Sequence, residues 1–367
     1  MHKQGNDLWA DRYDRQIRFA PIGTAGQAKL AEAQALIVGC GALGASLAQH
    51  LTRAGVGKVR IVDRDFVEPS NLQRQVLFNE ADALSMLPKA VAAADKLRAI
   101  NGSIEIEALV MDVNHHNLAA PLEGADIVLD GTDNAATRLL LSEACFARGI
   151  PFIYGGVAGS QGMSAALVPG ETCCLRCLIG EEADAEEGQN CDTAGVLSSS
   201  VEFVASLQAV EAVKWLSGNR DAIRKSWIAA DLWTFSVRES ALPGRSAGCP
   251  ICGRVIAKRD MTSHEQMQAG KESEAGSSSA SWCHTAAVAL CGRDSVQVTL
   301  PVTFQLEKWR ETFERLGYEY KANRYLLKVE LPESERLVLF PDGRVLVQGV
   351  ADPARALQLC SFYLTRP

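Results

Sequence analysis

Three glycines follow a short run of apolar residues early in the chain: Gly39, Gly41 and Gly44. The apolar run predicts a strand and the residues after the glycines predict a helix, which is the context in which a glycine-rich loop binds phosphate. Glycine lets the backbone approach a phosphate, and the start of a helix adds N–H groups and a positive dipole. Asp63 ends the next predicted strand, where an acid that binds a ribose is expected. Together these features predict a nucleotide site.

Four polar or cationic residues come soon after this strand: Ser70, Asn71, Arg74 and Lys89. The pyrophosphate of a dinucleotide is usually held by backbone alone, whereas a triphosphate has about four negative charges and needs cations and Mg²⁺. Asp130 and Asp133 end a later predicted strand and are candidates to hold that metal. The combination favours ATP over NAD. The alternative is that Arg74 and Lys89 are solvated surface cations paired with neighbouring acids.

Eleven cysteines are present, and four of them form two pairs with metal-ligand spacing: Cys174, Cys177, Cys249 and Cys252. Two CxxC pairs supply the four thiolates of a closed, tetrahedral zinc site, so a structural Zn²⁺ is expected. The pairs are far apart in the sequence, and the fold must therefore bring them together. Independent buried thiols are the alternative.

Cys191 lies in a loop rich in Gly, Asn and Asp, just before a predicted helix. The N-terminus of a helix can lower the pKa of a thiol, so a reactive thiol is one interpretation of Cys191. An unreactive loop thiol is the alternative.

Alternating strand and helix patterns predict the elements that position these residues. Strands are expected at 35–40, 58–63, 104–113, 126–133 and 151–157, and helices at 43–54, 88–100 and 135–148. This order is typical of a doubly wound, Rossmann-like α/β fold with a mostly parallel sheet. A further helix is predicted over 200–217, with Ser199 and Glu202 as a capping box and Gly218 as its stop.

Composition predicts two domains and a connection between them. Residues 258–281 are rich in Ser, Gly, Glu and Gln and poor in large apolar side chains, which predicts a flexible linker. The linker would join a domain at 1–257 to a small α+β module at 282–367. Zinc bound by the cysteines would hold together the C-terminal half of the first domain. In the small module, Asp352 is expected to cap the last helix.

The totals exclude several classes of protein. The formal net charge of −7 argues against a nucleic-acid partner, which would need a basic surface. No run of 18 apolar residues is present and the first residues are too polar for a signal peptide, so a cytoplasmic protein without a membrane partner is expected.

Nine motifs in order along residues 11 to 253 resemble the ThiF/MoeB/HesA family, relatives of the ubiquitin-activating enzymes that adenylate small sulfur-carrier proteins. They are RYDRQI, VGCGALG, AGVGKVRIVDRDFVEPSNLQRQ, LPKA, VLDGTDNAATR, CLRC, NCDTAGVL, SLQAVEAVKWLSG and CPICG. The motifs resemble the thiazole-branch (ThiF) members most closely, and the tail is similar to the C-terminal extension of ThiF-type proteins from Bacillus-like bacteria. One departure is Ala42, where many relatives have Gly.

The resemblance implies a role for each candidate residue. Gly39, Gly41 and Ala42 would line the nucleotide, Asp63 would bind its ribose, Asn71, Arg74 and Lys89 would contact the phosphates, and Asp133 would bind Mg²⁺, with Ser70 and Asn134 beside them. Arg15 would reach the ATP of a partner subunit, which implies a homodimer. Cys191 would link covalently to the carrier, and the CxxC cysteines would hold structural Zn²⁺.

The implied activity is ATP-dependent adenylylation of the C-terminal glycine of a ubiquitin-like sulfur carrier that ends in Gly-Gly, for thiamine thiazole synthesis. A sulfurtransferase or cysteine desulfurase is a further candidate partner. Three alternatives stay open: the same reaction on the molybdopterin-synthase carrier, an NAD-dependent oxidoreductase, and a binding module without turnover. The oxidoreductase would have no role for Arg74 or Asp133.

Overall fold

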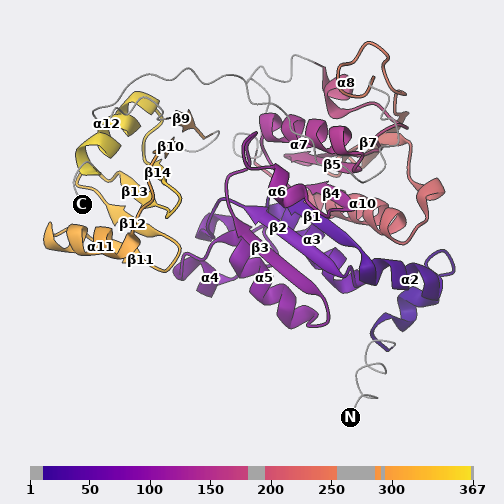
Figure 1. The fold of residues 1–367 in the computed structure, drawn as a ribbon, viewed down its shortest axis with the longest axis horizontal. Helices are drawn as coiled ribbons and strands as arrows, with labels where there is room; N and C mark the ends of the chain where they lie inside the picture. The colour runs from indigo at the N-terminus through magenta and orange to yellow at the C-terminus, as the bar shows by residue number, and fades with distance from the viewer. Residues whose placement is uncertain (1–10, 181–194, 254–285, 291–293, 365–367) are drawn as a thin grey trace, which may run out of the picture. The chain divides into compact units, whose positions relative to one another are not determined.

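The computed structural model of this 367-residue chain describes residues 11–180, 195–253, 286–290 and 294–364. The chain divides into two compact units, Met1–Ala257 and Lys258–Pro367 (Figure 1). The segment predicted as a linker, 258–281, lies outside the described residues.

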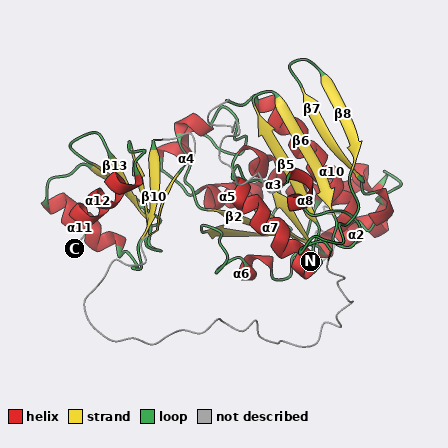
Figure 2. Cartoon of the chain, turned by 90° about the horizontal axis from the view of Figure 1, so that it is seen from above, coloured by secondary structure: helices red, strands yellow, loops and turns green. Residues whose placement is uncertain are grey.

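An eight-stranded sheet forms the centre of the first unit. Its strands are β1 (Gln34–Val38), β2 (Lys58–Asp63), β3 (Glu105–Val110), β4 (Ile127–Asp130), β5 (Phe152–Ala158), β6 (Gln161–Leu167), β7 (Ser226–Asp231) and β8 (Ser236–Ala241). They lie in the order β3-β2-β1-β4-β5-β6-β7-β8. The first five pair in parallel, whereas β6, β7 and β8 continue the sheet antiparallel beside β5 (Figure 2). The predicted mostly parallel α/β sheet is confirmed.

The helices of this unit cover both faces of the sheet. They are α2 (Gly23–Glu32), α3 (Ala42–Ala54), α4 (Glu80–Leu84), α5 (Lys89–Ile100), α6 (Ala119–Leu122), α7 (Ala135–Arg148), α8 (Leu175–Ile179) and α10 (Ser198–Leu216), with 3₁₀ turns η1 (Pro69–Asn71) and η3 (Arg220–Ala222). Alternate residues of β1 enter different clusters: Ile37 packs with α3, α5 and α10, while Leu36 packs with α7. Because side chains alternate along a strand, the two clusters lie on opposite faces.

The strand order places a switch point between β1 and β4. From β1 the chain continues outward through β2 to β3, then returns to add β4 on the other side of β1. In such sheets, ligands bind in the crevice outside the carboxyl ends of the two strands at this point. A ligand-binding site is therefore expected at the loops after β1 and β4.

The predicted capping box on the helix after Cys191 is wrong. Helix α10 begins at Ser198, with Leu197 as its N-cap residue and no capping side chain among the described residues. Glu202 is directed to α3 instead, where its Oε2 accepts a hydrogen bond from Ser46 Oγ at 2.7 Å. Contact between two packed helices therefore outweighs the local cap. The predicted stop is confirmed, since Gly218 has a left-handed φ of 89° just after the helix.

The second unit is an antiparallel sheet with its own apolar core. Its strands β9 (Ala286–Ala289), β10 (Ser295–Thr299), β11 (Tyr320–Ala322), β12 (Leu327–Glu330), β13 (Arg336–Leu339) and β14 (Arg344–Gln348) lie in the order β11-β12-β13-β14-β10-β9. Helices α11 (Leu306–Arg315) and α12 (Pro353–Tyr363) contribute to the core through residues such as Phe313 and Leu359. The predicted cap of α12 is confirmed, because Asp352 accepts a hydrogen bond from the Ala354 N–H at 3.0 Å.

Among the described residues, no helix combines the length and the apolar character that crossing a membrane requires.

Candidate functional site

The glycine loop after β1 packs directly against the loop after β4. Gly39 has a φ of +86°, and a Cβ there would lie 2.5 Å from the carbonyl oxygen of Gly131. A Cβ on Gly44 would collide with the Gly39 carbonyl. Helix α3 begins at Ala42, and no side chain of the described residues caps its N-cap, Gly41. The close approach leaves the first N–H groups of α3 available to an anion at the switch point.

Asp63 is held at the end of β2 beside this loop. Its Oδ2 accepts a hydrogen bond from the Cys40 N–H at 2.6 Å, and its Oδ1 accepts one from the Asp65 N–H at 2.6 Å. Burial raises the pKa of Asp63, although nearby Lys89 acts in the opposite direction. Each carboxylate oxygen has a second lone pair, so the carboxylate can still accept from a ribose hydroxyl.

Lys89 is the first residue of α5 and is buried, so it is not a solvated surface cation. Its Nζ lies 3.3 Å from Asp65 Oδ2, and its N–H donates to the Asp65 carbonyl at 2.9 Å. The Val67 N–H donates to the Leu87 carbonyl at 2.8 Å. These bonds fold the segment after β2 back on the start of α5. Asp65 was not among the residues predicted from the sequence, because its pairing with Lys89 depends on this return.

The segment from residue 70 to residue 75 lies against the same loop. Asn71 is fully buried, and its Oδ1 accepts from the Glu68 N–H at 3.2 Å, which closes the 3₁₀ turn. Ser70 is exposed, and its carbonyl accepts from Arg74 Nη1 at 2.9 Å. Gln75, which was not predicted as a site residue, is buried. Its amide nitrogen lies 3.9 Å from the position that a Cβ on Gly41 would occupy.

The loop after β4 separates the two candidate acids. Asp130 is fully buried and bonds to Thr132 and to Arg138, whose Nε donates to its Oδ2 at 3.0 Å. Burial raises the pKa of Asp130, and Arg138 opposes this. Asp133 and Asn134 are exposed, and Asn134 caps α7 by accepting from the Thr137 N–H at 2.9 Å. Asp133 is therefore the acid of the two that faces solvent.

Arg15 lies on a helical turn that is fixed to the unit by its neighbours. Tyr13 is buried, and its hydroxyl accepts a hydrogen bond from Asn101 Nδ2 at 2.8 Å. Gln16 donates to the Ala54 carbonyl at 2.9 Å. The Arg15 side chain is 87% exposed, so an anchored segment presents it to solvent.

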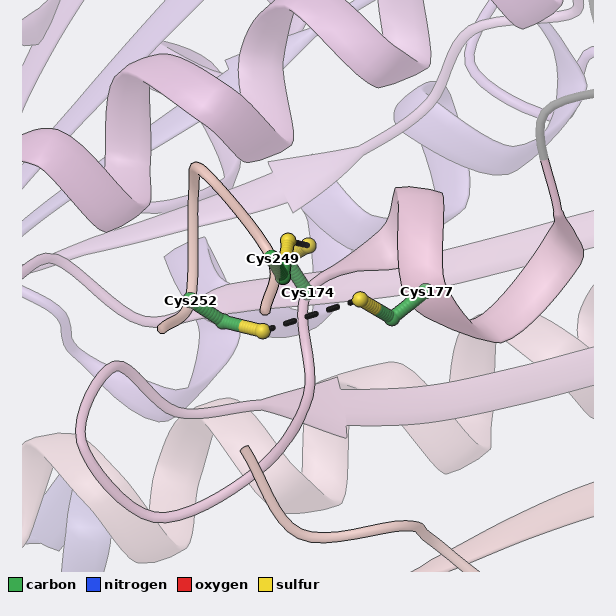
Figure 3. A group of neighbouring side chains, drawn as sticks. All are labelled: Cys174, Cys177, Cys249 and Cys252. Carbon is green, nitrogen blue, oxygen red and sulfur yellow. Dashed lines mark hydrogen bonds between the residues drawn. The ribbon is translucent and has the colours of Figure 1, made fainter. Parts of the chain in front are cut away.

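The two CxxC pairs come together in space, from the start of α8 and from the turn at residues 249–252 (Figure 3). The four ligand atoms all lie within 4.8 Å of one another. Two Sγ–Sγ distances, Cys174 to Cys249 and Cys177 to Cys252, are 3.7 Å. A tetrahedron with Zn–S bonds of about 2.3 Å has edges of about 3.8 Å, so the cluster fits a Zn²⁺ ion with no open position.

The thiols of the cluster differ in acidity. Burial acts to raise the pKa of Cys249, but hydrogen bonds from the Cys252 and Ile251 backbone and from neighbouring thiols lower it to about 6. Burial raises the pKa of Cys174 to about 11. Cys191, the candidate nucleophile, lies outside the described residues.

Comparisons with known proteins agree with this geometry. The ThiF family matches residues 13–251. The chain is 41% identical over 351 residues to the sulfur carrier protein ThiS adenylyltransferase of Bacillus subtilis, which covers 94% of this chain and 96% of that protein. It is 38% identical over 247 residues to the molybdopterin-synthase adenylyltransferase of Escherichia coli, covering 66% of this chain and 96% of that protein.

Solved structures share the fold over about two thirds of the chain. A crystal structure of Escherichia coli MccB with ATP matches with a TM-score of 0.58 at 23% identity, and the match covers 66% of this chain and 73% of that chain. The family match and the near full-length relative together decide the assignment: the chain belongs to the ThiF family.

Proposed function

We propose that this protein uses ATP to adenylylate the C-terminal glycine carboxylate of a ubiquitin-like sulfur carrier, releasing pyrophosphate, for thiamine thiazole synthesis. The observation that carries the proposal is the 41% identity with the Bacillus subtilis ThiS adenylyltransferase, which extends over 94% of this chain. The site supports it, because an acid, a buried lysine and a glycine loop meet at the switch point of the sheet.

The reaction needs positioning and charge neutralisation more than it needs a base. A carboxylate is already ionised, so it can attack the α-phosphate directly; its oxygen bonds to phosphorus while the bond to pyrophosphate breaks. The site must hold both anions together and stabilise the charge that leaves. Arg74 and Lys89 are the proposed cations for the phosphates, and Asp63 is the proposed ribose ligand.

Around these residues, Gly39, Gly41 and Ala42 would form the floor of the nucleotide site, with Ser70, Asn71 and Asn134 at its edge. Asp133 would hold Mg²⁺, which neutralises phosphate charge when bound. The exposure of Asp133 and the engagement of Asp130 by Arg138 support this choice.

Arg15 would act across a homodimer. Its side chain is 87% exposed on a segment that Tyr13 and Gln16 fix to the unit. A fixed, exposed arginine is suited to reach a phosphate in a second subunit. Arg15 is thus proposed to complete the partner's site.

The cysteines would have two separate roles. Cys174, Cys177, Cys249 and Cys252 would bind a structural Zn²⁺, because four thiolates leave no position for substrate. Cys191 would link to the activated carrier, and a sulfurtransferase or cysteine desulfurase would supply the sulfur. We also propose that residues 258–281 link two domains, 1–257 and 282–367.

The second candidate function is the same reaction on the molybdopterin-synthase carrier. The 38% identity with the Escherichia coli molybdopterin-synthase adenylyltransferase favours it, but that match covers 66% of this chain. Carrier choice depends on complementary surfaces, so the shared chemistry does not separate the two.

ATP–pyrophosphate exchange tests both candidates. The purified protein is assayed with Mg²⁺ and either a ThiS-type or a molybdopterin-type carrier, each intact or without its terminal glycine. We expect exchange that requires the intact ThiS-type carrier. Exchange with the molybdopterin-type carrier alone would reassign the pathway, and exchange with neither would refute carrier activation.

A further inference from the structure

Gln75 is a buried amide whose side chain has no hydrogen-bond partner within the described part of the chain. The residue is 3% exposed, and its Oε1 is enclosed without a partner. Its backbone is fully used, because the N–H donates to the Asn71 carbonyl at 3.0 Å and the carbonyl accepts from the Phe78 N–H at 3.1 Å. These two bonds fix the backbone of Gln75 and leave its side-chain amide able to bind another group.

Burying an amide without a partner destabilises the folded protein. Gln208 also has an enclosed Oε1 without a partner, but the amide nitrogens of two other buried glutamines of this unit do donate. Gln208 donates from Nε2 to the carbonyls of Asp130 and Ile153, and Gln27 donates to the Ala54 carbonyl. Gln75 differs from them in its amide nitrogen, which has no acceptor within the part of the chain that the structure describes.

The surroundings of the amide indicate what would bind there. Nε2 lies 3.9 Å from the position of a Cβ on Gly41, the N-cap residue of the 13-residue helix α3. The start of that helix, without a capping side chain in the described residues, attracts an anion. Oε1 is an acceptor and makes no bond to an anion, so the amide nitrogen beside Gly41 is the group that can donate to an anionic oxygen, and it does so without adding charge.

We propose that Gln75 binds the nucleotide directly, by donating its side-chain N–H to a phosphate oxygen at the start of α3. This inference rests on the proposed function, because ATP is the source of that phosphate. Arg74 and Lys89 supply charge, which acts over distance. Gln75 supplies a directional bond that fixes the rotation of the phosphate group, as in-line attack requires.

The variant Gln75→Met tests this role, since methionine has a similar size and lacks the amide. Two properties should change in opposite directions. The dissociation constant for ATP should increase about 10-fold, as expected for a lost bond to a charged group. The melting temperature of the nucleotide-free protein should rise by about 2 °C, because an unsatisfied buried amide is removed. Affinity for adenosine, which has no phosphate, should stay the same.

Gln34→Met is the matched control. Gln34 lies at the opposite end of β1, where its amide donates to the Glu123 carbonyl at 3.2 Å. This control should bind ATP like the wild type and should melt at a slightly lower temperature. Gln75→Glu is a second variant of similar size, and its negative charge should weaken ATP binding and leave adenosine binding unchanged.

Wild-type affinity for ATP in Gln75→Met would overturn the inference while the proposed function stands. Equal losses for ATP and adenosine, with a lower melting temperature, would assign Gln75 to folding and overturn the inference as well. A wild-type protein that binds no ATP would refute the proposed function and the inference together.

Discussion

In the cysteine cluster, four identical ligands from two short segments face one another, whereas the proposed nucleotide site collects unlike side chains from the loops after three strands. Two Sγ–Sγ distances of 3.7 Å already match a bound metal. In the nucleotide site, by contrast, Lys89 contacts Asp65 and Arg74 contacts Ser70. The cysteine ligands thus already face one another, whereas the cations proposed to bind phosphate contact groups of the protein itself.

The largest expected effect is on the structural site. The double variant Cys249→Ser/Cys252→Ser should lose bound metal and melt at least about 10 °C lower, because metal binding contributes directly to folding. Elemental analysis should find about one zinc per wild-type chain. The control variant Cys360→Ala, which removes a buried cysteine of the second unit, should contain as much zinc as the wild type. A metal-free wild type would contradict the assignment.

Arg74→Ala should produce the next largest effect, and this effect should be confined to the rate of pyrophosphate exchange. Loss of a cation that stabilises the leaving charge should slow pyrophosphate exchange about 10³-fold, equivalent to about 4 kcal/mol. The melting temperature should stay near that of the wild type, because the Arg74 side chain donates to an exposed carbonyl. Arg336→Ala, in the second unit, should leave exchange unchanged. A near-normal rate for Arg74→Ala would remove its assigned role.

Arg138→Met tests the comparison within the first unit, because it removes the ion pair between Arg138 and Asp130 beside the proposed nucleotide site. Asp130 would remain buried without its cation, which should cost about 3 kcal/mol of unfolding free energy. The pKa of Asp130 is already raised by burial and would rise further. In the folded variant the Asp130 carboxyl then stays protonated, whereas in the unfolded chain it ionises above about pH 4. The loss in unfolding free energy relative to the wild type should therefore grow as the pH rises.

Urea unfolding at mildly acidic and mildly alkaline pH measures this difference. The double variant Arg138→Met/Asp130→Asn should recover part of the loss and should be less sensitive to pH. A loss of the same size at both pH values would show that the pair acts through packing and not through charge.

How far the sequence predicts each site follows from the same contrast. The cysteine pairs could be assigned from spacing, because zinc chemistry specifies its ligands whatever the fold. The glycine loop and Asp63 were also predictable, since they flank strands that a βα pattern identifies. Helix α7 has the predicted bounds, Ala135–Arg148, because its Asn134 cap and the stop at Gly149 are local signals.

The contacts that could not be predicted all depend on distant segments. Asp65 pairs with Lys89 because the chain folds back at the bridge between Phe66 and Pro88. Gln75 lies close to Gly41, which belongs to the loop after a different strand. Glu202 fits a capping box in the sequence, yet its carboxylate bonds to Ser46 on another helix. Local spacing contains no information about such pairs.

The most direct test of the central claim is the intact mass of a ThiS-type carrier after incubation with the protein, ATP and Mg²⁺. We expect a carrier that has gained AMP at its C-terminus, formed by the wild type and by Arg336→Ala but not by Arg74→Ala. A carrier of unchanged mass under conditions where ATP is shown to bind would contradict the claim that this site activates a carrier carboxylate.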